Sequence, residues 1–313
     1  MRAISLVSKA LLLLLMGLGL APALAQSEEL TLEWVQRGAS PHFVYFLPQH
    51  YRDTPQDMTS KQIGTALECL EKTHALLTQI WGDNLAGKTE YFKLASRQEM
   101  GQVTGFLAQG LAIPSRSAIY SIHACHVHEV AHLLTLPDGF AALNTFWIEG
   151  IAMYFTWPSL TCDSEIPTPD CPYRDAIGFY EGHSVHFWAQ KFYRDRSLPA
   201  LSLLINGDPL FHQLDGQHSY PVAGSFIAFL LDQLRVEPRQ FRQFLEQASR
   251  ANSNAGVLDA FRLLLGRNLG SVEVEWHEFL ETWDEGRLRA VPTHTPYGGF
   301  CRTERTTPLY RPL

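Results

Sequence analysis

The spacing of hydrophobic residues changes from the first part of the chain to the second. Short apolar and aromatic runs predict strands at 42–47, 88–95 and 118–122. Between the first two strands, apolar positions recur at helical spacing and predict a helix over 59–81. Helix-compatible patterns, separated by Pro, Gly, Asn or Asp, then cover the segments 144–157, 176–194, 220–234, 239–250, 257–265 and 272–288. Because strands come early and helices late, we expect an α+β chain with a small N-terminal sheet and a mostly helical C-terminal part.

The composition is that of a globular protein. Hydrophobic residues make up 46% of the 313 residues and charged residues 18%, which does not fit disorder, collagen-like repeats or a coiled coil. Lys and Arg number 25 against 32 Asp and Glu, so the formal net charge is −7. Electrostatic binding of nucleic acid needs a basic face, and this balance argues against a nucleic-acid partner.

The first 25 residues have the pattern of a secretory signal peptide. Arg2 and Lys9 precede an apolar run over 10–25, and Ala23–Ala25 offers small residues for cleavage. The run is shorter than the roughly 20 residues that span a membrane. We therefore expect an exported protein, periplasmic or extracellular. No later segment is apolar enough to predict a transmembrane span in the mature chain.

An exported chain meets an oxidising compartment, so its five cysteines are candidates for disulfide bonds. Cys162 and Cys171 flank a segment with Pro167 and Pro169, and a loop there favours their pairing. The partners of the other cysteines stay open. There is no C-x-x-C pair, which argues against a thiolate zinc knuckle or a thioredoxin-type site.

The segment His128-Glu129-Val130-Ala131-His132 carries the most specific chemistry in the sequence. Residues four apart on a helix differ by about 40° in direction, so both imidazoles can reach one metal ion. Neutral imidazole is a good ligand for Zn²⁺, and Glu129 between the two histidines can act as a general base. The motif predicts a zinc site on a helix.

Catalytic zinc usually has three protein ligands, and two carboxylates compete for the third position. Glu149 follows His132 by 17 residues, on the helix predicted over 144–157. Asp138 follows His132 by six residues, the spacing of the third ligand in metzincins, but those enzymes need a glycine where Thr135 stands here. We favour Glu149.

The motif HEVAH followed by WIEGIAMYF resembles the gluzincin zinc metallopeptidases, in particular the exported peptidase-MA-like families. The likeness extends to the early strand-helix-strand order, to SYPVAGSFIAFLLDQL at 219–234 and to AFRLLLGRNLGSVEVEWHEFLETW at 260–283. It implies a zincin-like fold and one zinc ion held by His128, His132 and Glu149. It also implies that Glu129 serves as base and acid in the hydrolysis of a peptide or protein substrate.

Under this resemblance, residues 26–313 form one peptidase domain, with an α/β part at about 40–135 and a helical part at about 140–290. A donor to the transition state is expected downstream, and Tyr220 is the leading candidate, with His218 second. Related zinc aminopeptidases carry a G-x-M-E-N stretch, which does not occur before His128. This departure favours an endopeptidase.

Three residues near the motif have simpler interpretations than metal binding. His123 and His126 could contact and orient the metal-binding residues, but histidines at a strand-to-helix junction more often face solvent, and we interpret them so. Cys125 is interpreted as part of a disulfide bond or as a buried thiol. Two other functions share the same residues. The chain can be a non-catalytic zinc-binding or scaffold module at the cell surface, or a zinc hydrolase of a non-peptide amide such as a cell-wall cross-link.

Overall fold

The structure is a computed structural model that describes residues 32–82, 87–136, 143–156, 179–180, 183–206, 216–251 and 253–284. The expected signal peptide, Asp138 and the expected pair Cys162 and Cys171 lie outside the described residues. No described helix is both long enough and apolar enough to cross a membrane.

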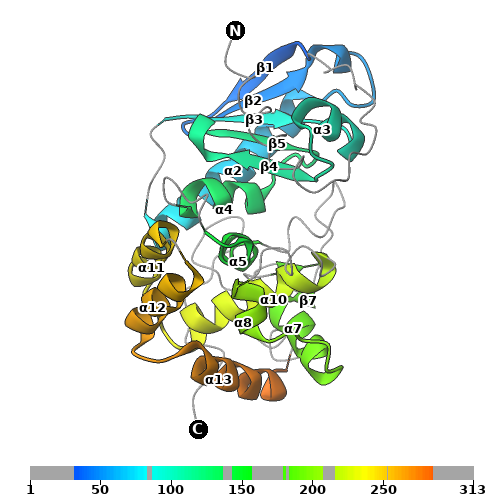
Figure 1. Cartoon of the computed structure of the whole chain (residues 1–313). Helices are drawn as coiled ribbons and strands as arrows, with labels where there is room; N and C mark the ends of the chain where they lie inside the picture. Colours follow the sequence, from blue (N-terminus) through cyan, green and yellow to red (C-terminus); the bar gives the residue numbers. More distant parts are fainter. Residues whose placement is uncertain are drawn as a thin grey trace, which may run out of the picture.

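The N-terminal part is a five-stranded mixed sheet (Figure 1). Its strands are β1 (Trp34–Ala39), β2 (Phe43–Pro48), β3 (Thr89–Lys93), β4 (Gly110–Ile113) and β5 (Ala118–Ser121), in the order β1-β2-β3-β5-β4. The pairs β2 with β3 and β3 with β5 are parallel, whereas β1 and β4 are antiparallel edge strands. The three predicted strands are confirmed to within two residues, and the two edge strands were not predicted.

Alternate residues of the strands pack on opposite faces of the sheet. Helices α2 (Ser60–Trp81) and α4 (Val127–Thr135) lie on the face that carries Tyr45 and Tyr91, which are fully buried. Helix α3 (Arg97–Thr104) places Met100 on the other face against Phe92 and Tyr120. Both faces are therefore covered, and α4 lies between the sheet and the helical part (Figure 1).

The C-terminal part is mostly helical, which confirms the α+β class. Its helices are α5 (Thr145–Tyr154), α7 (Val185–Arg194), α8 (Leu201–Asn206), α10 (Gly216–Ala228), α11 (Pro238–Arg250), α12 (Asn254–Leu265) and α13 (Leu269–Thr282). Helices α5 and α10 cross closely at Gly150, where an added Cβ would lie 3.0 Å from the carbonyl oxygen of Ala223. This approach fixes the position of the helix that carries Glu149.

Three predicted helix boundaries are wrong. The helix expected from 176 begins only at Val185, because the Ser184 hydroxyl accepts a hydrogen bond from the His186 N–H and caps it. Before it, the strands β6 (Phe179–Tyr180) and β7 (His183–Ser184) pair antiparallel.

The helix expected over 220–234 begins at Gly216 and widens into a π-helical segment over Phe229–Gln233. Helix α13 ends at Thr282 rather than at 288, since Trp283 has an extended backbone.

A disulfide bond joins helix α2, which packs on the sheet, to the segment that precedes the HEVAH motif at 128–132. Cys69 on α2 pairs with Cys125 in the connection from β5 to α4. This confirms the interpretation of Cys125 as a disulfide or buried thiol. The bond therefore attaches the segment at the start of α4 to α2.

Candidate metal centre

Two helices from different parts of the chain carry the three predicted ligands. His128 and His132 lie one turn apart on α4, which follows β5 through a short connection. Glu149 lies in the second turn of α5, whose start is fixed by Asn144. The side-chain oxygen of Asn144 accepts from the Phe146 N–H at 2.7 Å, and its amide donates to the Ile205 carbonyl at 2.6 Å. The cap therefore ties the Glu149 helix to α8 as well.

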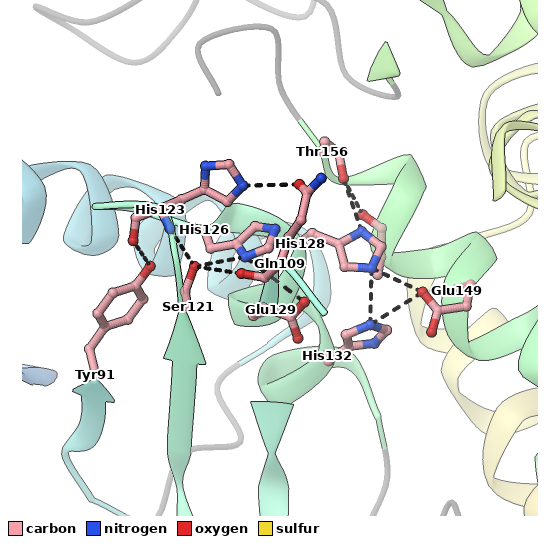
Figure 2. Close-up of polar contacts among 11 residues, drawn as sticks. Tyr91, Gln109, Ser121, His123, His126, His128, Glu129, His132, Glu149 and Thr156 are labelled. Carbon is pink, nitrogen blue, oxygen red and sulfur yellow. Dashed lines mark hydrogen bonds and ion pairs between the residues drawn. The ribbon is translucent and has the colours of Figure 1, made fainter. Parts of the chain in front are cut away.

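The three side chains converge on one point (Figure 2). Nε2 of His128 lies 3.0 Å from Oε2 of Glu149 and 3.1 Å from Nε2 of His132. Nε2 of His132 lies 3.5 Å from the same carboxylate oxygen. Ligands placed tetrahedrally at the usual zinc bond lengths of about 2.0–2.1 Å lie about 3.3 Å apart. The spacing of the donor atoms and the donor set of two imidazoles and a carboxylate both fit a zinc ion.

The electrostatics favour an ionised carboxylate at this point. Burial opposes the ionisation of Glu149, but the imidazoles of His132 and His128 outweigh it and hold its pKa well below the usual range. Burial likewise disfavours a charge on His132, yet the Glu149 carboxylate raises the pKa of this histidine. The pocket thus provides a fixed negative charge where a cation would bind.

A hydroxyl group lies beside Nδ1 of His128, the ring nitrogen that does not face Glu149. Thr156 follows α5, and its hydroxyl donates to the Ala152 carbonyl at 2.9 Å. Its oxygen lies 3.4 Å from Nδ1 of His128 and can accept the proton of that nitrogen (Figure 2). Nε2 then keeps its lone pair for a metal ion. Nδ1 of His132 is buried and has no hydrogen-bond partner within the described part of the chain.

Glu129 is buried beside the three ligands but is not one of them. Its helix position turns its carboxylate toward His126, whose Nδ1 lies 4.0 Å from Oε1 of Glu129. The structure therefore separates the carboxylate of Glu149, which can bind a metal ion, from that of Glu129, which lies beside the group.

Tyr220 reaches the same region from α10. Its ring centroid lies 6.2 Å from that of His128. Burial raises the pKa of Tyr220, and the charges of Glu149 and Glu129 raise it further. The phenol therefore keeps its proton at neutral pH and can donate a hydrogen bond. The side chain of His218, the second candidate donor, lies outside the described residues.

The sequence interpretation of His126 is wrong, because this residue does not face solvent. Only 14% of its side chain is exposed, and Nδ1 lies 3.0 Å from the Ser121 hydroxyl. His123 is partly buried, and its Nε2 lies 3.1 Å from the Gln109 side-chain oxygen (Figure 2). The run of histidines before the motif was the available signal, but their contacts with Ser121 at the end of β5 and with Gln109 before β4 depend on how the chain folds back.

A second group of His42, Glu71 and His74 also brings two imidazoles and a carboxylate together. Here His42 Nδ1 lies 2.7 Å from Glu71 Oε2, and the His42 N–H donates to Oε1 at 2.8 Å. The rings of His42 and His74 are stacked with centroids 3.8 Å apart, so their in-plane lone pairs do not meet at one point. In this group, His42 and Glu71 form a hydrogen-bonded pair, and the ring of His74 stacks on that of His42.

A search of protein-family models finds no match to the sequence, and a search of curated proteins finds none either. Within the described residues, the geometry establishes a group of His128, His132 and Glu149 that can hold a metal ion.

Proposed function

We propose that this protein is an exported zinc-dependent metallopeptidase of the gluzincin type that cuts within peptide chains. The observation that carries the proposal is the convergence of His128 Nε2, His132 Nε2 and Glu149 Oε2, with the separate carboxylate of Glu129 buried beside them. Three ligands leave one position open, which is the pattern of catalytic rather than structural zinc.

Zinc, when bound by these three residues, polarises a carbonyl group and makes a nearby water more acidic. Glu129 then accepts the proton of the water that attacks the peptide carbon, and it passes this proton to the leaving amine. The hydroxyl of Tyr220 donates a hydrogen bond to the oxyanion that develops on the carbonyl oxygen. The protonated state of this phenol, which burial and nearby carboxylates maintain, suits it to that role.

The edge of the sheet supports a peptide as the substrate. Strand β4 pairs with β5 on one side and is the last strand in the order of the sheet. Its first residue, Gly110, lies against Glu129. An extended peptide that adds to this edge by main-chain hydrogen bonds would pass beside the general base. Such binding does not require a chain end, in agreement with an endopeptidase.

Two features support export. The N-terminal sequence has the pattern of a signal peptide. The disulfide bond between Cys69 and Cys125 is consistent with an oxidising compartment, such as the periplasm or the extracellular space. These features favour a substrate that the protein meets outside the cytoplasm.

The test is a digest of a mixed peptide library by the mature protein beside Glu129→Gln, with zinc supplied to both and bound zinc measured. Internal cuts made only by the wild type would support the proposal. Ladders trimmed from one end would replace it with an exopeptidase. If neither protein cuts, release of products from a cell-wall preparation by the wild type alone would point to a non-peptide amide. Bound zinc without any hydrolysis would favour a binding or scaffold module.

A further inference from the structure

The side chain of His126 neither caps helix α4 nor belongs to the group of His128, His132 and Glu149. His126 is the N-cap residue of α4, yet its side chain caps no backbone N–H. Nδ1 instead lies 3.0 Å from the hydroxyl of Ser121, which is fully buried and also accepts from the His123 N–H at 2.9 Å. The ring is thus fixed by the end of β5, with Nδ1 facing Glu129 (Figure 2).

Gly110 faces the gap between His126 and Glu129. A Cβ built on Gly110 would lie 2.4 Å from Nδ1 of His126 and 2.5 Å from Oε1 of Glu129, closer than real Cβ contacts. An alanine here would force the His126 ring or the Glu129 carboxylate to shift, and both side chains are largely buried. The backbone of Gly110 is not in the left-handed region. This position therefore needs glycine for the close approach of the edge strand and not for backbone freedom.

The carboxylate of Glu129 receives no hydrogen bond from the residues that the structure describes, so packing has to set its direction. We propose that His126 and Gly110 are positioning residues that hold this carboxylate toward the attacking water; the inference rests on the proposed role of Glu129. The ring and the bare backbone of Gly110 both lie against Oε1 of this carboxylate and limit where it can move. A general base displaced by about 1 Å can lose about 100-fold in rate.

Three variants of the zinc-loaded protein test this role. Gly110→Ala pushes on the carboxylate, and His126→Phe keeps a ring but loses the contact with Ser121. Both are expected to lower kcat about 10- to 100-fold, with KM and bound zinc unchanged. His126→Asn retains a polar atom near the position of Nδ1 and is expected to recover part of the loss. Gly64→Ala, on the exposed face of α2 where an added Cβ meets nothing within 4 Å, is the matched control.

A binding measurement separates this inference from the proposed function. Acetohydroxamate chelates zinc and donates a hydrogen bond to an adjacent carboxylate, so its affinity reports the direction of Glu129 without turnover. We expect about 10-fold weaker binding by Glu129→Gln, Gly110→Ala and His126→Phe than by the wild type. Unchanged binding by Glu129→Gln would overturn the role of the base. Weaker binding by Glu129→Gln alone would overturn the positioning role. If Gly110→Ala does not fold, the comparison of His126→Phe with His126→Asn decides the same question.

Discussion

A disulfide bond joins Cys69 on helix α2 to Cys125, three residues before the ligand His128. It crosses from the helix beneath the sheet to the segment that starts the metal-binding helix. The same connection carries His126, which faces Glu129. The covalent bond therefore fixes the start of the helix that carries two of the proposed ligands and the proposed general base, although it lies outside the group of His128, His132 and Glu149.

Replacing both cysteines by serine is expected to destabilise the fold by about 4 kcal/mol, since the bond closes a loop with a sequence separation of 56 in the unfolded chain. Urea denaturation of Cys69→Ser/Cys125→Ser and of the wild type measures this difference. The wild type treated with a reductant is the control and is expected to match the variant. Equal stability of all three would show that the bond adds nothing to the fold.

Glu149→Ala is expected to remove most of the bound zinc, because two imidazoles alone hold zinc much less tightly than a three-ligand site. Asp138→Ala is the comparison, since Asp138 is the competing third ligand by sequence spacing. We expect it to retain zinc at the level of the wild type. Elemental analysis after dialysis gives both values. A greater loss in Asp138→Ala than in Glu149→Ala would transfer the ligand role to Asp138.

Thr156→Val is expected to weaken zinc binding about 10-fold or more, because the hydroxyl that accepts from His128 Nδ1 is lost while the side-chain volume is kept. Thr156→Ser retains the hydroxyl and serves as the control. Competition with a zinc chelator of known affinity measures both. Equal affinities for the two variants would mean that the 3.4 Å contact does not select the ring nitrogen.

His186 is expected to give the fold a pH-dependent stability. Burial lowers its pKa to about 3, and Nδ1 lies 2.9 Å from the Ser225 hydroxyl. Between pH 6.5 and about 3 the unfolded chain binds a proton that the folded chain does not, so this site loses stability as the pH falls. The loss approaches about 1.4 kcal/mol per pH unit within that window.

His186→Asn should remove this contribution, although it lowers stability at every pH. Urea denaturation at pH 7 and pH 5 measures the change in the free energy of unfolding for the wild type and the variant. The wild type is expected to lose more stability than the variant, by up to about 2 kcal/mol. Comparing the two proteins cancels the pH dependence of other groups. Equal losses would contradict a neutral buried His186.

The local part of the metal centre could be predicted from the sequence, because a helix places residues four apart on one face. This reasoning identified His128 and His132, and the helical pattern around Glu149 supplied the third ligand that the structure brings to them. The α+β class followed from the change in hydrophobic spacing. Each of these inferences uses only short-range geometry.

The residues that surround the centre could not be predicted in the same way. Thr156 and Ser121 act through contacts with histidines that packing brings near, 28 and 5 residues away. Gly110 begins an edge strand of only four partly buried residues, too short to give a clear alternation. The short strands β6 and β7 fell within a predicted helix, because they are recognised only by their pairing with each other and by the serine cap that starts α7. Such features are set by tertiary contacts, which the recurrence of hydrophobic residues every 3.6 positions in a helix or every 2 in a strand does not encode.

Tyr220→Phe isolates the proposed hydrogen bond to the developing oxyanion. The ring and its contact with His128 remain, so bound zinc and the free energy of unfolding are expected to match the wild type. Loss of one oxyanion donor typically lowers kcat about 100- to 1000-fold, with little effect on KM. Steady-state kinetics on a peptide found in the library digest measures both constants. Tyr193→Phe, which removes a surface hydroxyl that donates to Glu281, is the control and is expected to have wild-type kinetics. The phenol keeps its proton at neutral pH and is therefore able to donate. A kcat for Tyr220→Phe equal to that of the wild type would leave this tyrosine only a packing role against α4. The donor would then have to be another side chain near the proposed metal site.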